Sequence, residues 1–267
     1  MNRTLMRALA ALLLLSGLVP VVAQAQAREE SRLLVATEVL TELRSQRDDA
    51  IPDRLLQRAY GIAVIPDVTK VAFVLGGRRG SGVLVVRDAT GRFTNPVFVS
   101  LTGGGVGWQI GVQSTDIVLV FTTRRGVEGL AGGQLTLGAG ASVAAGPVGR
   151  QGEAAAGLDA EVFSYSRNRG LFAGVSLDGT ALSIDKGANA RFYGRSGVLA
   201  SEIMSGAVTR DNASLQGFLA EVSRSTGAAP ATVPAPAPQP LPPQGPAPAP
   251  VPPPSGGARS FPADDPR

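Results

Sequence analysis

The chain has 267 residues, of which 44% are hydrophobic and 17% are charged, and its formal net charge is +4. It contains no cysteine and no histidine. These absences exclude disulfides, thiol nucleophiles, histidine bases and metal sites built on histidine or cysteine within this sequence. The basic excess is too small for a general nucleic-acid binder, so we expect no nucleic-acid partner, and any electrostatic site must come from local clusters.

Residues 1–27 have the pattern of a secretory signal peptide. The segment "MNRTLMR" is short and basic, "ALAALLLLSGLVPVV" is apolar, and "AQAQA" offers small residues for cleavage after Ala25 or Ala27. A membrane anchor is the alternative, but the apolar run is shorter than the roughly 20 residues that a spanning helix needs, and Pro20 interrupts it. We therefore expect an exported protein that is periplasmic or associated with the cell envelope, with secretion into the medium as a further option.

Residues 226–267 form a tail rich in proline and alanine. It carries 15 of the 20 prolines and almost no large apolar side chains, so it cannot bury enough surface to fold. Repeated Pro-Ala sequence favours an extended spacer. The alternative is a ligand for a protein partner that recognises proline.

Residues 28–225 are long enough for one domain with a sizeable core. Helices are predicted at both of its ends, because apolar residues recur there at helical spacing. In the region from Arg28 to Tyr60 these residues are Leu33, Ala36, Leu40 and Leu43, followed after Pro52 by Leu55, Leu56 and Ala59. After Asp211 they are Leu215, Phe218, Leu219 and Val222, and Asp185 is a candidate cap for a short helix between. The first helix could lie on a membrane, but packing on the domain is favoured.

From Gly61 to about Ile184 the sequence changes to short β-rich runs separated by glycine. Such spacing is typical of an antiparallel sheet or barrel. The runs are "GIAVI", "VAFVL", "GVLVV", "PVFVSL", "WQIGVQ", "DIVLVFTT", "QLTLGAGASVAA", "AEVFSYS", "LFAGVSL" and "TALSI". The predicted class is thus α+β, a glycine-rich antiparallel sheet or barrel-like domain with helices at both ends.

The segment "LFAGVSLDGT" predicts a strand followed by a two-residue hairpin turn. Alternation places Leu171, Ala173, Val175 and Leu177 on one apolar face of that strand. Asp178 and Gly179 then match the turn into "TALSI".

Motifs for nucleotide cofactors and for enzymes are incomplete. No GxGxxG is completed, and neither lysine follows a glycine as a Walker loop requires, so we expect no cofactor and no metal. The segment "SIDK", Ser183 to Lys186, matches the SxxK pattern of penicillin-recognising enzymes, but no KTG element exists. A Ser-Lys hydrolase is therefore only a minor alternative.

Basic residues recur where the β-rich runs end. The guanidinium fork matches phosphate oxygens, and neighbouring glycines let backbone N–H groups approach the same anion. If these loops converge, they form an anion-binding rim. The candidate contacts are Arg78, Arg79, Arg124, Arg125, Arg150 and Arg167, to which the family resemblance given below adds Lys70.

Several blocks closely resemble the SYLF domain family, a lipid-binding domain found in yeast and animal endocytic proteins and in exported bacterial proteins. The similarity runs from about Leu55 to Gly194 and includes "AYGIAVIP", "GGRRGSGVLVVRD", "GRFTNP", "GGGVGWQIGVQSTDIVLV", "LTLGAGASVAAGPVGR", "YSRNRGLFAGVSLDG" and "NARFYG". The resemblance implies binding to anionic phospholipids, with actin as a further ligand of some eukaryotic members. Two segments depart from the family, "FTNP" where many relatives have a tryptophan and "KVAF" where a glycine commonly follows the lysine.

The resemblance and the leader together lead us to expect an exported, non-enzymatic protein that recognises anionic phospholipid headgroups at a membrane surface. Phosphoinositides and actin are not carried over, because an exported bacterial protein does not ordinarily meet them. The alternative from another class is an envelope scaffold or adaptor that captures a protein partner through its proline-rich tail.

Overall fold

The computed structural model describes residues 20–45, 51–148, 160–168 and 171–228. The predicted tail from residue 229 onward, residues 1–19 of the predicted leader, and Arg150 lie outside these ranges. The helices are α2 (Pro20–Ser45), α3 (Asp53–Gln57), α4 (Arg124–Ala131), α6 (Lys186–Tyr193), α7 (Ala200–Met204) and α8 (Ala213–Thr226). The strands are β1 (Gly61–Val86), β2 (Val97–Phe121), β3 (Gln134–Thr136), β4 (Val143–Ala145), β5 (Val162–Asn168), β6 (Leu171–Gly174) and β7 (Ala181–Ile184).

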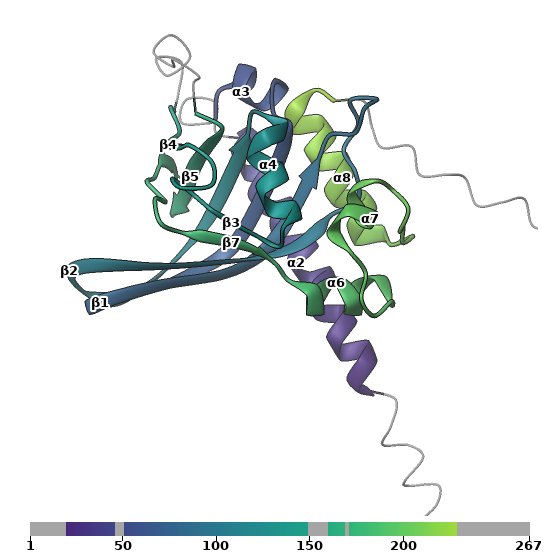
Figure 1. Cartoon of the computed structure of the whole chain (residues 1–267), viewed down its shortest axis with the longest axis horizontal. Helices are drawn as coiled ribbons and strands as arrows, with labels where there is room; N and C mark the ends of the chain where they lie inside the picture. The colour runs from purple at the N-terminus through teal and green to yellow at the C-terminus, as the bar shows by residue number, and fades with distance from the viewer. Residues whose placement is uncertain (1–19, 46–50, 149–159, 169–170, 229–267) are drawn as a thin grey trace, which may run out of the picture. The chain divides into compact units, whose positions relative to one another are not determined.

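The fold is α+β, as predicted, and its centre is a long antiparallel ribbon of β1 and β2 (Figure 1). Six of the predicted short runs are merged in these two strands. The ribbon connects two parts of one sheet. The first half of β2 pairs with β7, and its second half pairs with β5. One pairing departs from the antiparallel prediction, since β4 runs parallel to β5.

The ribbon bends back on itself in the middle of each strand. Its register shifts between Ala72 and Val74, and the two halves of β1 then meet at glycines. A Cβ placed on Gly82 would lie 2.2 Å from the carbonyl oxygen of Val64, which no side chain tolerates. Glycine is therefore required where the halves cross, and the predicted glycine-spaced runs mark a sharply bent strand rather than separate strands joined by turns.

Alternate residues of the strands face two different helical layers. On one face, Val64, Val83 and Phe98 belong to a buried cluster that includes the apolar residues of α2, α3 and α8. On the other face, Ile65 and Leu84 belong to a second cluster, with residues of α4 and α7. Because both faces are covered in the outer segments of the two strands, those segments read as nearly continuous hydrophobic runs.

Helix α2 packs on the domain, as the sequence analysis favoured. Leu33, Ala36, Leu40 and Leu43 are at most 1% exposed and lie in the first cluster together with the apolar side of α8. The helix begins at Pro20, earlier than the predicted start at Arg28. No helix in the described ranges has the length and apolar character to cross a bilayer.

The predicted cap of α6 is confirmed, because the Asp185 carboxylate accepts a 2.9 Å hydrogen bond from the backbone N–H of Ala188. The last helix is capped by Asn212, whose side chain accepts hydrogen bonds from the backbone N–H groups of Ser214 and Leu215. Helices α4 and α7 were not predicted. Both are short, and their sequences contain glycine or lack a long apolar period, so tertiary packing decides their conformation.

The predicted strand and hairpin at residues 171–184 need correction. Leu171 is exposed and Phe172 is buried, the reverse of the predicted faces, and the strand ends at Gly174. The turn at Gly179 exists, with φ of 73°, but β6 pairs with β5 whereas β7 pairs with β2 and β3. The turn therefore leads the chain from one part of the sheet to another instead of closing a hairpin.

Candidate anion-binding surface at the ribbon bend

Three of the predicted basic residues lie on the two halves of β1 that meet beside the bend. Val68 and Gly80 approach so closely that a Cβ on Gly80 would be 3.3 Å from Val68 Cα. Lys70 follows Val68 by two residues, and Arg78 and Arg79 precede Gly80 by two and one. Lys70 and the pair Arg78 and Arg79, which are eight and nine positions apart in sequence, therefore flank the point where the two halves of β1 approach each other.

Arg78 lies across β2 and is partly buried without a carboxylate partner. It is opposite Gly103 in the ladder, and a Cβ on Gly103 would lie 3.1 Å from Arg78 Cγ and 2.9 Å from Thr180 Oγ1. Burial lowers the pKa of the Arg78 guanidinium, and no ion pair among the described residues involves it or Lys70 or Arg79. A guanidinium that loses water without gaining a counter-ion favours binding of an external anion.

Two exposed valines accompany these basic residues. Val71 is 49% exposed, Val112 is 71% exposed, and the two are direct partners in the β1–β2 ladder. Lys70 is paired with Gln113 in the next position. We call Lys70, Val71, Arg78, Arg79 and Val112 the bend surface; because consecutive strand residues point to opposite faces, it comprises both faces of the ribbon at the bend. The two valines could not be identified from the sequence, because both lie in apolar runs that are typical of buried strands.

Arg124 and Arg125 belong to another part of the fold. They begin α4, whose N-cap Thr123 accepts a hydrogen bond from the backbone of Gly126. The Arg124 guanidinium pairs with Glu128 at 2.8 Å, and that of Arg125 lies 3.6 Å from Glu161. Both arginines are highly exposed, and each has an acidic neighbour that reduces its attraction for an external anion.

Arg167 is engaged with carboxylates inside the protein. Its Nε donates to Asp116 at 2.6 Å, and its Nη1 forms an ion pair with Glu42 of α2. Burial lowers the pKa of Arg167, but the hydrogen bonds and charges of Asp116 and Glu42 outweigh this and raise it overall. The predicted rim is therefore divided by the fold, with the bend surface, the start of α4 and the Arg167 cluster in different environments.

The two residues of the alternative Ser-Lys pair lie in different elements, one at the end of a strand and one at the start of the next helix. Ser183 is in β7, between Ser100 of β2 and Gln134 of β3, whereas Lys186 is the first residue of α6. Within the described ranges, no three acidic side chains are grouped in a way that could hold a metal ion.

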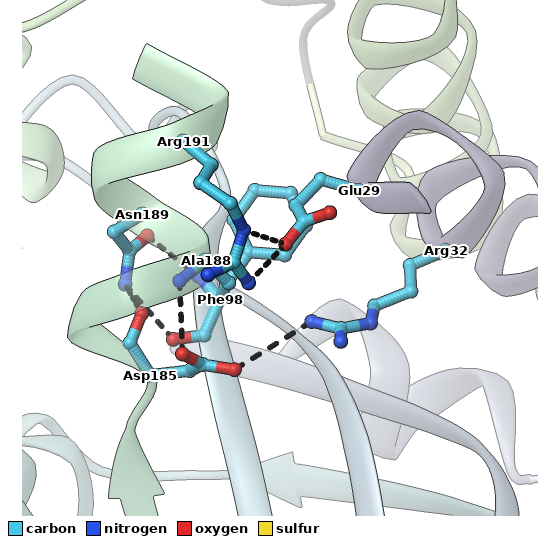
Figure 2. Close-up of polar contacts among 7 residues, drawn as sticks. All are labelled: Glu29, Arg32, Phe98, Asp185, Ala188, Asn189 and Arg191. Atoms are coloured by element: carbon cyan, nitrogen blue, oxygen red, sulfur yellow. Dashed lines mark hydrogen bonds and ion pairs between the residues drawn. The ribbon is translucent and has the colours of Figure 1, made fainter. Parts of the chain in front are cut away.

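A second polar cluster joins α2 to α6 and β2 (Figure 2). Arg191 donates to the Glu29 carboxylate at 2.6 and 3.0 Å, and Arg32 lies 3.7 Å from Asp185. Asn189 accepts from the backbone N–H of Phe98 and donates to its carbonyl. The family segment "NARFYG" therefore begins with residues that fasten α6 to the sheet and to α2.

Glu29 is fully buried although it is charged. It continues the spacing of Leu33, Ala36, Leu40 and Leu43 toward the start of α2, so it occupies a core position of the helix. This spacing is visible in the sequence and could have identified Glu29 as buried. A search for apolar residues at helical spacing does not find it, because its side chain is a carboxylate.

Residues 102–224 match the family described as "Ysc84: Las17-binding protein actin regulator". The SH3 domain-containing YSC84-like protein 1 of Xenopus laevis is 36% identical over 190 residues, which cover 70% of this chain and 56% of that protein. The Homo sapiens protein of the same name is 38% identical over 173 residues, covering 64% of this chain and half of that protein. The LAS seventeen-binding protein 3 of Saccharomyces cerevisiae is 42% identical over 152 residues, covering 55% of this chain and 33% of that protein.

The chain thus spans about half the length of these vertebrate relatives and a third of the yeast relative. The similarity therefore identifies a shared domain.

Proposed function

The chain belongs to the SYLF domain family, also called Ysc84, and from this premise we propose that it is a non-enzymatic membrane-binding protein. Its ligands are anionic phospholipid headgroups, which it binds through the bend surface. The observation that carries the proposal is the combination of Lys70, Arg78 and Arg79, which have no carboxylate partner, with the exposed pair Val71 and Val112.

The physical chemistry of the bend surface supports this proposal. A basic residue near an anionic membrane contributes about 1 kcal/mol, so three contribute about 3 kcal/mol at low salt. Two valines that leave water add apolar burial, each up to roughly 1.5 kcal/mol. The two contributions differ in their response to salt, because the electrostatic one is screened within a Debye length of about 10 Å at 0.1 M.

The proposed location is the periplasmic face of a membrane, reached by export through the leader at residues 1–27. A non-enzymatic role is consistent with the description of the family, which names binding and regulation, and with the name of the yeast relative, which names binding.

Vesicle co-sedimentation of the protein without its predicted leader, residues 28–267, tests the site. Replacing Lys70, Arg78 and Arg79 by glutamine should weaken binding to anionic vesicles by roughly 100-fold, the equivalent of about 3 kcal/mol. The wild-type protein should bind neutral phosphatidylcholine vesicles only weakly. Equal binding to neutral and anionic vesicles would refute headgroup recognition.

A control variant with the same loss of charge separates location from net charge. Arg54 lies on α3, Arg58 is the C-cap of α3, and Lys186 begins α6; all three are exposed and form no ion pair within the described ranges. Their triple glutamine variant should bind anionic vesicles much more tightly than the bend variant. Equal loss in the two variants would exclude the bend as the site.

The names of the relatives favour a second candidate function, the binding of a protein partner. The yeast relative is a LAS seventeen-binding protein, and the vertebrate ones contain an SH3 domain. In this chain the proline-rich tail is the segment proposed to recruit such a partner. Deleting residues 229–267, which leaves α8 and its C-cap Gly227 in place, should then abolish partner capture and leave vesicle binding intact, whereas unchanged capture would place the partner site on the folded domain.

A further inference from the structure

Arg167 connects α2 to both strands of the ribbon through a continuous set of charged and polar contacts. Its guanidinium binds Glu42 of α2 and Asp116 of β2. The other carboxylate oxygen of Asp116 accepts a 3.0 Å hydrogen bond from the backbone N–H of Asp67 in β1. The backbone carbonyl of Arg167 also accepts a 2.7 Å hydrogen bond from the Thr115 hydroxyl.

This set of contacts ends at an unusual point of β1. Asp67 has φ of 50°, the left-handed region, and among the described residues it is the one non-glycine residue with positive φ. It lies where the β1–β2 register shifts, between Ile65 and Val68. A backbone held in this conformation relaxes unless its surroundings fix it, and here the fixing contact is the Asp116 carboxylate.

The strained residue directly precedes the bend surface. Lys70 and Val71 follow Asp67 by three and four residues, and Val112 precedes Asp116 by four residues on the partner strand. The direction in which both strands leave the domain therefore depends on how Asp67 and Asp116 are held. Asp116 is 8% exposed, so it depends on the guanidinium of Arg167 to compensate its charge.

We propose that Arg167 is a positioning residue that couples the docking of α2 to the orientation of the bend surface. Glu42 holds the guanidinium from the helix side, Arg167 holds Asp116, and Asp116 holds the Asp67 backbone. This inference rests on the proposed function for its effect on membrane binding, but its structural half can be measured without lipid.

The direction in which a charge-removing substitution changes vesicle affinity distinguishes this role from general electrostatic attraction. Glu42→Gln removes a negative charge, so general attraction to an anionic vesicle should become stronger. If Glu42 holds Arg167 in place, Glu42→Gln should instead weaken vesicle binding, because the guanidinium is no longer fixed from the helix side. The expected loss is about 2- to 30-fold, the range expected for substitutions along a coupled network. The matched control is Glu38→Gln, an exposed carboxylate one turn earlier on α2 that has no ion pair within the described ranges.

Arg167→Gln distinguishes a positioning residue from a lipid contact. A direct contact contributes to the salt dependence of binding, so its loss lowers the slope of log affinity against log salt. Arg167→Gln should lower the affinity and leave this slope unchanged, whereas Arg78→Gln should lower both. A lower slope for Arg167→Gln would make it a headgroup ligand and overturn the proposal.

Hydrogen exchange of the full-length protein provides the readout without lipid. The amide of Asp67 should exchange faster in Glu42→Gln than in the wild type or in Glu38→Gln, because its acceptor Asp116 becomes less well held. Unchanged exchange at Asp67, or vesicle binding of Glu42→Gln as tight as that of Glu38→Gln, would refute the coupling. If wild-type protein does not bind anionic vesicles at all, the proposed function fails, and exchange at Asp67 still decides whether the network holds the strand.

Discussion

At the scale of single residues, the fold divides basic side chains that look alike in the sequence. Arg78 is partly buried without a counter-ion, Arg125 is exposed near Glu161, and Arg167 is paired with two carboxylates. All three follow or precede glycine or polar residues in similar segments. Their roles could not be separated from sequence, because the partners Asp116 and Glu42 are 51 and 125 positions from Arg167.

The close crossing of β1 on itself leads to a prediction about Gly82. A Cβ there would lie 2.2 Å from the Val64 oxygen and 2.6 Å from Ile65 Cα, both backbone atoms that cannot move without opening the bend. Gly82→Ala should lower the free energy of unfolding by about 3 kcal/mol, at the upper end of the range for overpacking. The measurement is urea unfolding followed by circular dichroism.

Gly104→Ala is the control for this substitution. Gly104 is in the same ribbon, but no atom lies within 4 Å of the position that its Cβ would take. The free energy of unfolding of the Gly104→Ala variant should differ from that of the wild type by less than about 1 kcal/mol. Similar destabilisation by both substitutions would mean that strand propensity, and not the crossing, makes glycine necessary.

At the scale of elements, periodicity predicted the long helices and failed for the ribbon. The stripes of α2 and α8 were identified because each helix has one buried face, and their members are buried as predicted. The runs of β1 and β2 were identified as strands, but their continuity was not, since a strand that bends at glycines resembles strands separated by turns. The pairing of β6 with β5 depends on distant contacts that no local pattern contains.

The docking of α2 leads to a prediction about its buried charge. Arg191→Met leaves the Glu29 carboxylate buried without its partner, which should cost about 3 kcal/mol of unfolding free energy. The double variant Glu29→Leu with Arg191→Met removes both charges and should recover most of that loss. Urea unfolding of the two single variants and the double variant gives the coupling energy.

An exposed ion pair serves as the reference for this experiment. Arg195 and Glu202 lie 3.2 Å apart with the arginine largely exposed, so Arg195→Met should cost less than about 1 kcal/mol. If Arg191→Met is equally mild, or if the effects at Glu29 and Arg191 simply add, the buried pair does not fix the position of α2.

At the scale of the whole molecule, the near balance of charge conceals a local asymmetry. The formal net charge of +4 arises from 25 basic and 21 acidic residues, and many of them are paired in the structure. The bend surface keeps three basic residues without such pairs, beside an exposed apolar pair. The family and the class of fold could be recognised from sequence, but the bend surface depends on the doubling back of β1, which brings distant positions together.

The absence of cysteine from the sequence allows one direct test of the proposed membrane contact. Val112→Cys and Leu199→Cys can each be labelled with a polarity-sensitive fluorophore at a single exposed position, the first on the bend surface and the second next to α7. Addition of anionic vesicles should shift the emission of the label at Val112 to shorter wavelength and leave the label at Leu199 unchanged, and neutral vesicles should shift neither. A shift at Leu199 without one at Val112, under conditions in which the protein co-sediments with anionic vesicles, would contradict the assignment of the bend surface as the membrane-binding site.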